Sequence, residues 1–143
     1  MPNRRSHDPI GNYNFRVEIE GVTQGAFKAV EGLDSQTEII EYQDGDDITL
    51  RKRPGKTRYS NIVLKRGFVN SQEFWDWRKA VVDGKVDRKS GSVILLDDSG
   101  GEVMRYNFFE GWPCSWKGFE LNGRGSEASV EEIQIAVERI ERG

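Results

Sequence analysis

The sequence predicts a mainly β protein of the α+β class, in which an antiparallel β-barrel or sandwich carries one flanking α-helix. Three observations predict this fold. Apolar and polar residues alternate over residues 13–19, as expected for a strand with one buried face. One segment, about residues 71–83, has an apolar stripe at helical spacing. The other apolar runs are short and are separated by turn residues.

Strands are expected along the N-terminal part of the chain. Residues 13–19 place aromatic and β-branched side chains on one side and Asn, Arg and Glu on the other. After a turn at Gly21, residues 26–30 form a second segment, and residues 37–42 are rich in β-branched side chains. These segments predict a meander of antiparallel strands.

Residues 43–58 are predicted to form a long extended loop. The segment reads QDGDDITLRKRPGKTR, in which Gly45, Pro54 and Gly55 interrupt polar and charged residues. Loops of this length are uncommon inside a compact domain and often have a function. The chain then resumes an extended pattern over residues 59–68.

One helix is predicted over about residues 71–83. Asn70 suits its N-terminus, because the amide oxygen accepts a hydrogen bond from an unpaired backbone N–H, and Glu73 suits the helix dipole. Gly84 is a natural end of the helix. The expected core side of the helix consists of Phe74, Trp77 and Val81.

The C-terminal part is predicted to be extended. Residues 92–96 and 102–109 flank the turn sequence DDSGG and predict a hairpin. Residues 113–121 predict a further strand. The apolar residues of segment 129–140 fit both helical spacing and alternation, and their β-branched character favours a strand.

Length and composition are those of one soluble globular domain over residues 1–143, in which residues 1–9 are expected to be a flexible N-terminal segment. No apolar run approaches the ~20 residues that span a bilayer, so we expect neither membrane insertion by the monomer nor a signal peptide. Cys114 is the single cysteine, so no internal disulfide is expected. Synthesis in a cytoplasm is consistent with this.

The sequence offers little for catalysis. His7 is the single histidine and lies in a polar segment where the fixed geometry of proton transfer is not expected. Cys114 lacks the basic or helix-terminal setting that activates a thiol. These two residues are too few for a zinc site, and the acidic residues of segment 44–47 lack the spacing of a calcium loop. No catalytic residue, cofactor site or metal site is predicted.

Charge is segregated around the predicted loop, although the net charge of −3 argues against sequence-specific nucleic-acid binding. An acidic block precedes a basic block. One hypothesis is a solvated loop; the other is a surface where one copy's block meets the opposite charge of another copy. The candidate inter-ring or inter-subunit residues are Glu41, Asp44, Asp46, Asp47, Arg51, Lys52, Arg53, Lys56 and Arg58.

Five motifs, taken in order, carry a resemblance to a known family: DPIGNYNFRVEIEG, AVEGLDSQTEIIEYQDGD, RPGKTRYSNIVLKRGF, FWDWRKAVVDGKVDRKSG and RYNFFEGWP. Together they resemble the tail-tube, or inner-tube, proteins of contractile-tailed phages and related extracellular contractile injection systems. The resemblance extends over about residues 8–140, and it is specific because both the order and the spacing of the motifs match those of the family.

The resemblance implies a fold similar to that of the type VI secretion tube protein and a structural, non-enzymatic role. Hexameric rings would stack into a hollow tube, which sheath contraction drives through a target envelope while DNA or effector proteins pass along the bore. The implied partners are other copies of the chain, the sheath protein, baseplate, tube-initiator and terminator proteins, and a tape-measure protein or lumen cargo. Synthesis in a bacterial cytoplasm and assembly into a phage tail or injection particle are also implied.

Two departures from the family pattern leave alternatives open. Val137 stands before Glu138 where members often have histidine, and Glu110 and Gly111 precede Trp112 where members commonly have a small apolar residue. Within the family, the chain is therefore either the bulk tube subunit or a specialised initiator or terminator ring. A different class also stays open, a monomeric β-sheet domain that binds a ligand through its aromatic residues.

Overall fold

The computed structural model describes residues 14–20, 22–69, 72–121 and 128–143. Within this part of the chain lie nine strands and one helix: β1 (Phe15–Ile19), β2 (Val22–Glu31), β3 (Ser35–Tyr42), β4 (Arg51–Tyr59), β5 (Ile62–Val69), α1 (Gln72–Val82), β6 (Lys89–Leu96), β7 (Glu102–Leu121), β8 (Ala128–Ala136) and β9 (Arg139–Arg142). The predicted N-terminal segment 1–9, His7 and Asn70 lie outside the described residues.

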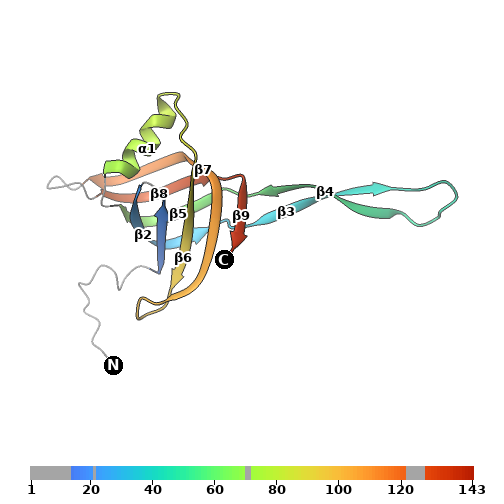
Figure 1. The fold of residues 1–143 in the computed structure, drawn as a ribbon, viewed down its shortest axis with the longest axis horizontal. Coiled ribbons are helices and arrows are strands. Elements are labelled where there is room, and N and C mark those ends of the chain that lie inside the picture. Colours follow the sequence, from blue (N-terminus) through green and yellow to red (C-terminus); the bar gives the residue numbers. More distant parts are fainter. Residues whose placement is uncertain (1–13, 21, 70–71, 122–127) are drawn as a thin grey trace.

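Six strands form a closed antiparallel barrel in the order β6-β1-β2-β5-β8-β7, and pairing of β6 with β7 closes it. The short strand β9 adds to the free side of β7, and α1 packs on β7 and also contacts β2 (Figure 1). The predicted mainly β fold with one helix is confirmed.

Strand β7 makes two different pairings. Its first half pairs with β6 up to Gly111, and its second half pairs with β8 from Trp112 onward. The strand bends where it changes partner, and Glu110 there has a φ of 56°. The prediction of two separate strands over 102–109 and 113–121 is therefore wrong. One long strand covers both ranges, because it passes from β6 to β8 and so closes the barrel.

The core lies inside the barrel and under α1. Phe74 is fully buried, Trp77 is 3% exposed, and Val81 is half-buried. The Trp77 indole also donates to the Asp87 carbonyl at 2.6 Å. The other buried hydrophobic residues of this cluster come from the barrel strands: Val17, Ile19, Phe27, Ile62, Leu64, Val69, Val93, Phe108, Val130, Ile133 and Ile135.

Helix α1 ends close to Gly84, as the sequence predicts. Gly84 has a φ of 89° and its N–H donates to the Val81 carbonyl, while the Lys85 N–H donates to the Ala80 carbonyl. These two bonds satisfy carbonyls that the helix itself leaves unpaired, and the positive φ favours glycine.

The predicted loop 43–58 is wrong for its second half, because residues 51–59 are strand β4. β3 and β4 form a separate two-stranded antiparallel ribbon, and only residues 43–50 connect them. Both faces of this ribbon meet solvent, so its residues show no apolar alternation to indicate a strand. Pro54 and Gly55 sit beside a register shift between Thr37 and Ile39, where a ribbon edge tolerates them.

Candidate assembly surface

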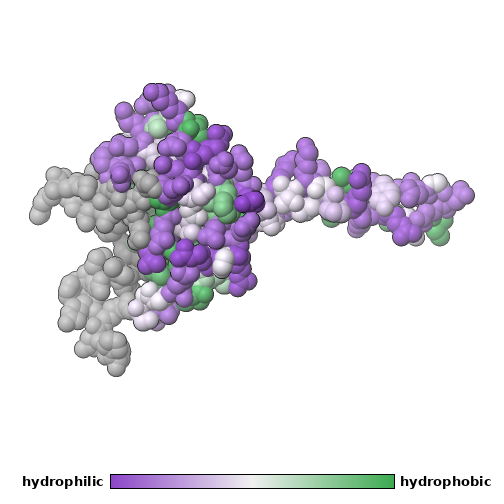
Figure 2. All heavy atoms as spheres, in the orientation of Figure 1, coloured by the Kyte–Doolittle hydropathy of each residue, from purple (hydrophilic) through white to green (hydrophobic). Residues whose placement is uncertain are grey.

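The β3–β4 ribbon with its connection, residues 35–59, projects from the barrel as an arm (Figure 1). Figure 2 shows the arm as a narrow, mostly hydrophilic projection with isolated hydrophobic side chains. Ile39 is 64% exposed, Leu50 is 52% exposed and Ile48 is 94% exposed. No residue of the arm belongs to the buried core, so the arm's own contacts leave large apolar side chains in water.

The register of the arm places the acidic and basic blocks opposite each other. Glu41 pairs with Lys52 and Tyr42 pairs with Arg51. At the end of the ladder, Arg51 Nε donates to Asp47 Oδ2 at 2.8 Å. The pKa of Asp47 is lowered, first by the hydrogen bond from the Thr49 N–H and then by Arg51. The two blocks are thus partly neutralised within the chain.

Of the nine candidate residues, Asp47 and Arg51 pair with each other. The other seven make no ion pair with any residue that the structure describes. Three arginines, Arg51, Arg53 and Arg58, lie opposite Tyr42, Ile40 and Gln36, all even-numbered positions of β3 and so on one face of the ribbon. The Arg53 guanidinium lies 6.0 Å from the centre of the Tyr42 ring. The seven are Glu41, Asp44, Asp46, Lys52, Arg53, Lys56 and Arg58.

A cleft lies at the half of the arm nearer the barrel, where the strands shift register. It has a volume of about 370 Å³, and we call it the root cleft. Lys56 and Arg58 supply its positive charge, and Ile39 supplies an exposed apolar surface. Its lining residues are Gln36, Thr37, Glu38, Ile39, Lys56 and Arg58.

A second cleft of about 400 Å³ lies at the bend of β7. Glu110 and Glu138 flank it, and the Arg139 guanidinium lies over the Phe109 ring at 4.2 Å. The two sequence departures noted above are at or next to these two glutamates. The structure therefore brings both departures to one place.

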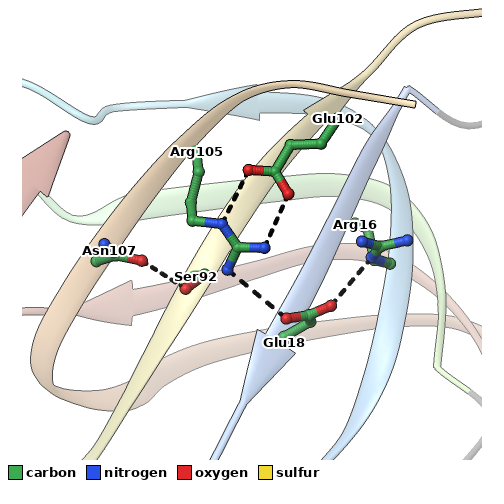
Figure 3. Close-up of polar contacts among 6 residues, drawn as sticks. All are labelled: Arg16, Glu18, Ser92, Glu102, Arg105 and Asn107. Atoms are coloured by element: carbon green, nitrogen blue, oxygen red, sulfur yellow. Dashed lines mark hydrogen bonds and ion pairs between the residues drawn. The ribbon is translucent and has the colours of Figure 1, made fainter. Parts of the chain in front are cut away.

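Sequence reasoning missed a polar network on the outside of the barrel (Figure 3). Arg105 makes two hydrogen bonds to Glu102, at 3.0 and 2.9 Å, and lies 3.8 Å from Glu18. Arg16 Nε lies 3.2 Å from Glu18 in an ion pair without a hydrogen bond. The residues come from β1 and β7, far apart in the chain, so no local sequence signal indicates the network.

The network covers an apolar residue on the outer face. Ile94 lies between Arg16 and Arg105 in register and is fully buried, yet it is separate from the barrel core. The Arg105 side chain lowers the pKa of Glu102, and Glu102 in turn raises the pKa of Arg105. Beside this network, on strands β6 and β7, Ser92 Oγ donates to Asn107 Oδ1 at 2.6 Å.

Cys114 has no activating environment in the structure. It is half-buried, and burial raises the pKa of its thiol. Its sulfur accepts from Asn61 Nδ2 at 3.8 Å. Among the described residues, no three His, Cys, Asp or Glu side chains gather to hold a metal ion, and no helix is long and apolar enough to cross a membrane.

Comparison with known families assigns the chain as a whole to a family. The model of a family described as "T4-like virus tail tube protein gp19" matches residues 11–141. The chain belongs to this tail tube family. A comparison with curated proteins finds no match.

Solved structures of tube proteins have the same fold as this tail tube chain. One is from the "PVC sheath-tube complex in extended state" of an extracellular contractile injection system, with 28% identity, a TM-score of 0.70 and coverage of 96% of this chain and 93% of the other. Another, titled "PVC sheath/tube terminator in extended state", has 26% identity, a TM-score of 0.68 and coverage of 97% and 99%. Hcp1 from Flavobacterium johnsoniae shares the fold at 19% identity, a TM-score of 0.50 and coverage of 92% and 95%.

Proposed function

We propose that this tail tube protein forms hexameric rings that stack into a hollow tube, and that the arm carries contacts between copies. The observation that carries the proposal is the arm itself. It is a two-stranded ribbon with exposed Ile39, Ile48 and Leu50, and a ribbon of this kind is marginal in water unless something packs against it. A neighbouring copy supplies that packing in a polymer of identical subunits.

The strand edges support the same proposal. β9 pairs with β7 on one side, and β3 and β4 pair with each other. Each outer edge of the arm presents backbone N–H and C=O groups that a neighbouring strand can satisfy. Assembly would thus protect edges that aggregate when they stay open.

The tube is proposed to work mechanically, with no bond made or broken by this chain. The resemblance to a sheath-tube complex supports a contractile sheath around the tube, and sheath contraction would drive the tube through a target envelope. DNA or effector proteins would leave through the bore. The half-buried Cys114 with its raised pKa is consistent with a non-enzymatic chain.

A specialised terminator or initiator ring is the second candidate. The structure titled as a sheath/tube terminator matches almost as well as the sheath-tube complex, at 26% against 28% identity. Copy number relative to sheath in purified particles separates the candidates. A bulk subunit should be present in a number of copies that rises with the number of sheath subunits, whereas an end ring should be present in a single ring's worth of copies.

Electron microscopy of the purified protein tests the proposal directly. The wild-type protein is expected to form rings and tubes at high concentration. The matched variant replaces residues 41–52 by Asn-Gly, a two-residue turn that joins the Ile40–Arg53 pair. This variant keeps the barrel core and is expected to be a folded monomer by circular dichroism and light scattering. Tubes of normal length from the shortened variant, or a persistently monomeric wild-type protein, would refute the proposal.

A further inference from the structure

We propose that the arm tip, residues 43–50, of one copy docks into the root cleft of another copy's arm. This inference rests on the proposed assembly of copies through the arm and names the contact that makes it. The occupant of the root cleft is a second copy of this chain, and its chemistry is an acidic tip with an apolar anchor.

The arm tip is internally ordered. Asp47 Oδ1 accepts from the Thr49 N–H at 2.9 Å, and Asp47 Oδ2 accepts from Arg51. The Asp47 carbonyl accepts from Gln43 Nε2 at 2.7 Å, and the Asp47 N–H donates to the Asp44 carbonyl at 2.7 Å. A connection held in this way loses less conformational entropy on binding than a free one.

The ordered tip leaves a binding face unused within its own chain. The carboxylates of Asp44 and Asp46 make no ion pair with any described residue, and Ile48 is 94% exposed. The tip thus carries one exposed isoleucine and two carboxylates without a cationic partner among the described residues. Such a surface gains binding free energy from a partner surface that offers cations and apolar side chains.

The root cleft has the complementary composition. Lys56 and Arg58 line it without an ion pair inside the described chain, and Ile39, which is 64% exposed, is also part of its lining. Glu38 is the one acidic residue of the lining. Thr37 and Thr57 satisfy each other, with their hydroxyl oxygens 2.9 Å apart. The cleft therefore presents an excess of positive charge, and Ile39 adds an apolar side chain to its lining from the other face of the ribbon.

An arm cannot place its tip in its own root cleft. Gln36 in the cleft and Tyr42 at the last ladder pair lie on the same straight strand, roughly 20 Å apart at about 3.4 Å per residue, and the tip lies beyond Tyr42. The contact is therefore between copies and is head-to-tail. A head-to-tail contact closes into a ring when its rotation closes and otherwise continues as a helix.

Charge exchange tests the contact. The tip-reversed variant Asp44→Lys/Asp46→Lys and the root-reversed variant Lys56→Glu/Arg58→Glu are each expected to lose sedimentable tubes, because tip and cleft then have the same sign. The variant that carries all four changes is expected to regain tubes. An equimolar mixture of the two double variants is expected to assemble as well, because each tip then meets an oppositely charged cleft on the other variant.

A matched control makes the same charge change away from the arm. Lys79→Glu/Lys85→Glu alters exposed lysines at α1 and just after it, and this control is expected to assemble like the wild type. Wild-type assembly by either single-site double variant overturns the tip-to-root contact. So does failure of both the fourfold variant and the mixture to assemble. Those results leave the wider proposal standing if the arm-shortened variant still fails to form tubes.

Cysteine crosslinking gives a second readout that does not depend on tube yield. In a Cys114→Ala background, a Gln36→Cys protein is mixed with an Ile48→Cys protein under oxidising conditions. A disulfide needs Cα atoms less than about 7 Å apart, so a covalent dimer forms only if a tip reaches a root cleft. The expected product is the mixed dimer, and its absence in assembled tubes would overturn the inference.

Discussion

Asp47, in the middle of the arm's connection, forms an ion pair with Arg51, the first residue of β4, with Arg51 Nε 2.8 Å from Asp47 Oδ2. The same carboxylate accepts from the Thr49 N–H. One side chain therefore bonds to two residues that follow it in the chain and offsets the charge of the first arginine of the basic block. The arm is consequently more ordered and less polarised than its sequence indicates.

Substitution of Asp47 is expected to loosen the arm tip in two steps. Asp47→Asn keeps an acceptor for the Thr49 N–H and loses the ion pair, whereas Asp47→Ala loses both. Hydrogen exchange at the Thr49 amide should therefore increase from the wild type through Asn to Ala. Unfolding of the barrel by urea should be unchanged, since the tip makes no core contact. Equal exchange in all three proteins would contradict the assigned bond.

The order of the tip should also depend on pH. The pKa of Asp47 is lower in the folded chain than its ordinary value of about 3.9, so its bonds stabilise the tip fully above that value. The stabilisation is lost as the pH falls through the lowered pKa. The exchange rate of the Thr49 amide, divided by its intrinsic rate at each pH, should therefore stay constant from pH 7 to about 5 and rise below about pH 4. Asp47→Ala should lack this rise.

Gly111 is expected to be essential for the bend of β7. A Cβ atom there would lie 2.7 Å from Phe108 Cε1 and 3.1 Å from Ile135 Cγ2, inside the packed core. Gly111→Ala should therefore lower the free energy of unfolding by about 1–3 kcal/mol, measured by urea titration. Gly118→Ala on the same strand is the control, because its Cβ would meet Trp116 Nε1 at 3.5 Å. A change there should stay within about 0.5 kcal/mol, and equal effects at the two glycines would disprove the packing argument.

Helix α1 is expected to be held by two aromatic residues. Phe74→Ala and Trp77→Ala each remove a buried ring and should lower the free energy of unfolding by about 3–5 kcal/mol. Val82→Ala, at a position 66% exposed, should change it by no more than about 0.5 kcal/mol. Thermal and urea unfolding of the three proteins measure the difference. A comparable loss for Val82 would show that the outer side of α1 is covered in solution.

Arg105 is expected to stabilise the barrel through geometry more than through charge. Arg105→Lys keeps the charge but cannot make the paired bonds to Glu102, and Arg105→Ala also uncovers Ile94. The urea midpoint should fall in the order Arg, Lys, Ala. The fall in the urea midpoint that comes from the lost charge should be smaller in 1 M salt. The fall that comes from exposing Ile94 should remain.

The control for Arg105 is Arg88, whose side chain is 48% exposed and lies 3.9 Å from Glu138. Exposed pairs of this kind contribute little, so Arg88→Ala should leave the urea midpoint unchanged. If Arg88 and Arg105 gave the same result, the network on β1 and β7 would have no special role.

Local chemistry explains the predictions that were confirmed. The DDSGG turn between β6 and β7 forms as expected, since Asp97 Oδ1 accepts from the N–H groups of Ser99 and Gly101 and Gly100 has a φ of 88°. The segment after residue 128 is strand, as its β-branched residues favoured, although it divides into β8 and β9. Each of these features depends on neighbours in the chain.

The assembly candidates were predicted from charge order alone, and they stay a prediction. The predicted conformation of their segment as a loop was wrong for residues 51–58, which belong to strand β4. The alternation rule needs one buried face, and both faces of the arm are exposed. Nothing local distinguishes such a strand from a loop.

The sequence by itself determined the mainly β class, the single helix with Phe74 and Trp77 on its inner side, and the turns, because each is recorded in the spacing of residues along the chain. The tertiary structure decided which strands pair, where β7 bends, that β4 joins β3 as an arm, and that Arg105 reaches Glu18. Those outcomes depend on closing a barrel and on contacts between distant residues. Local periodicity carries no record of either.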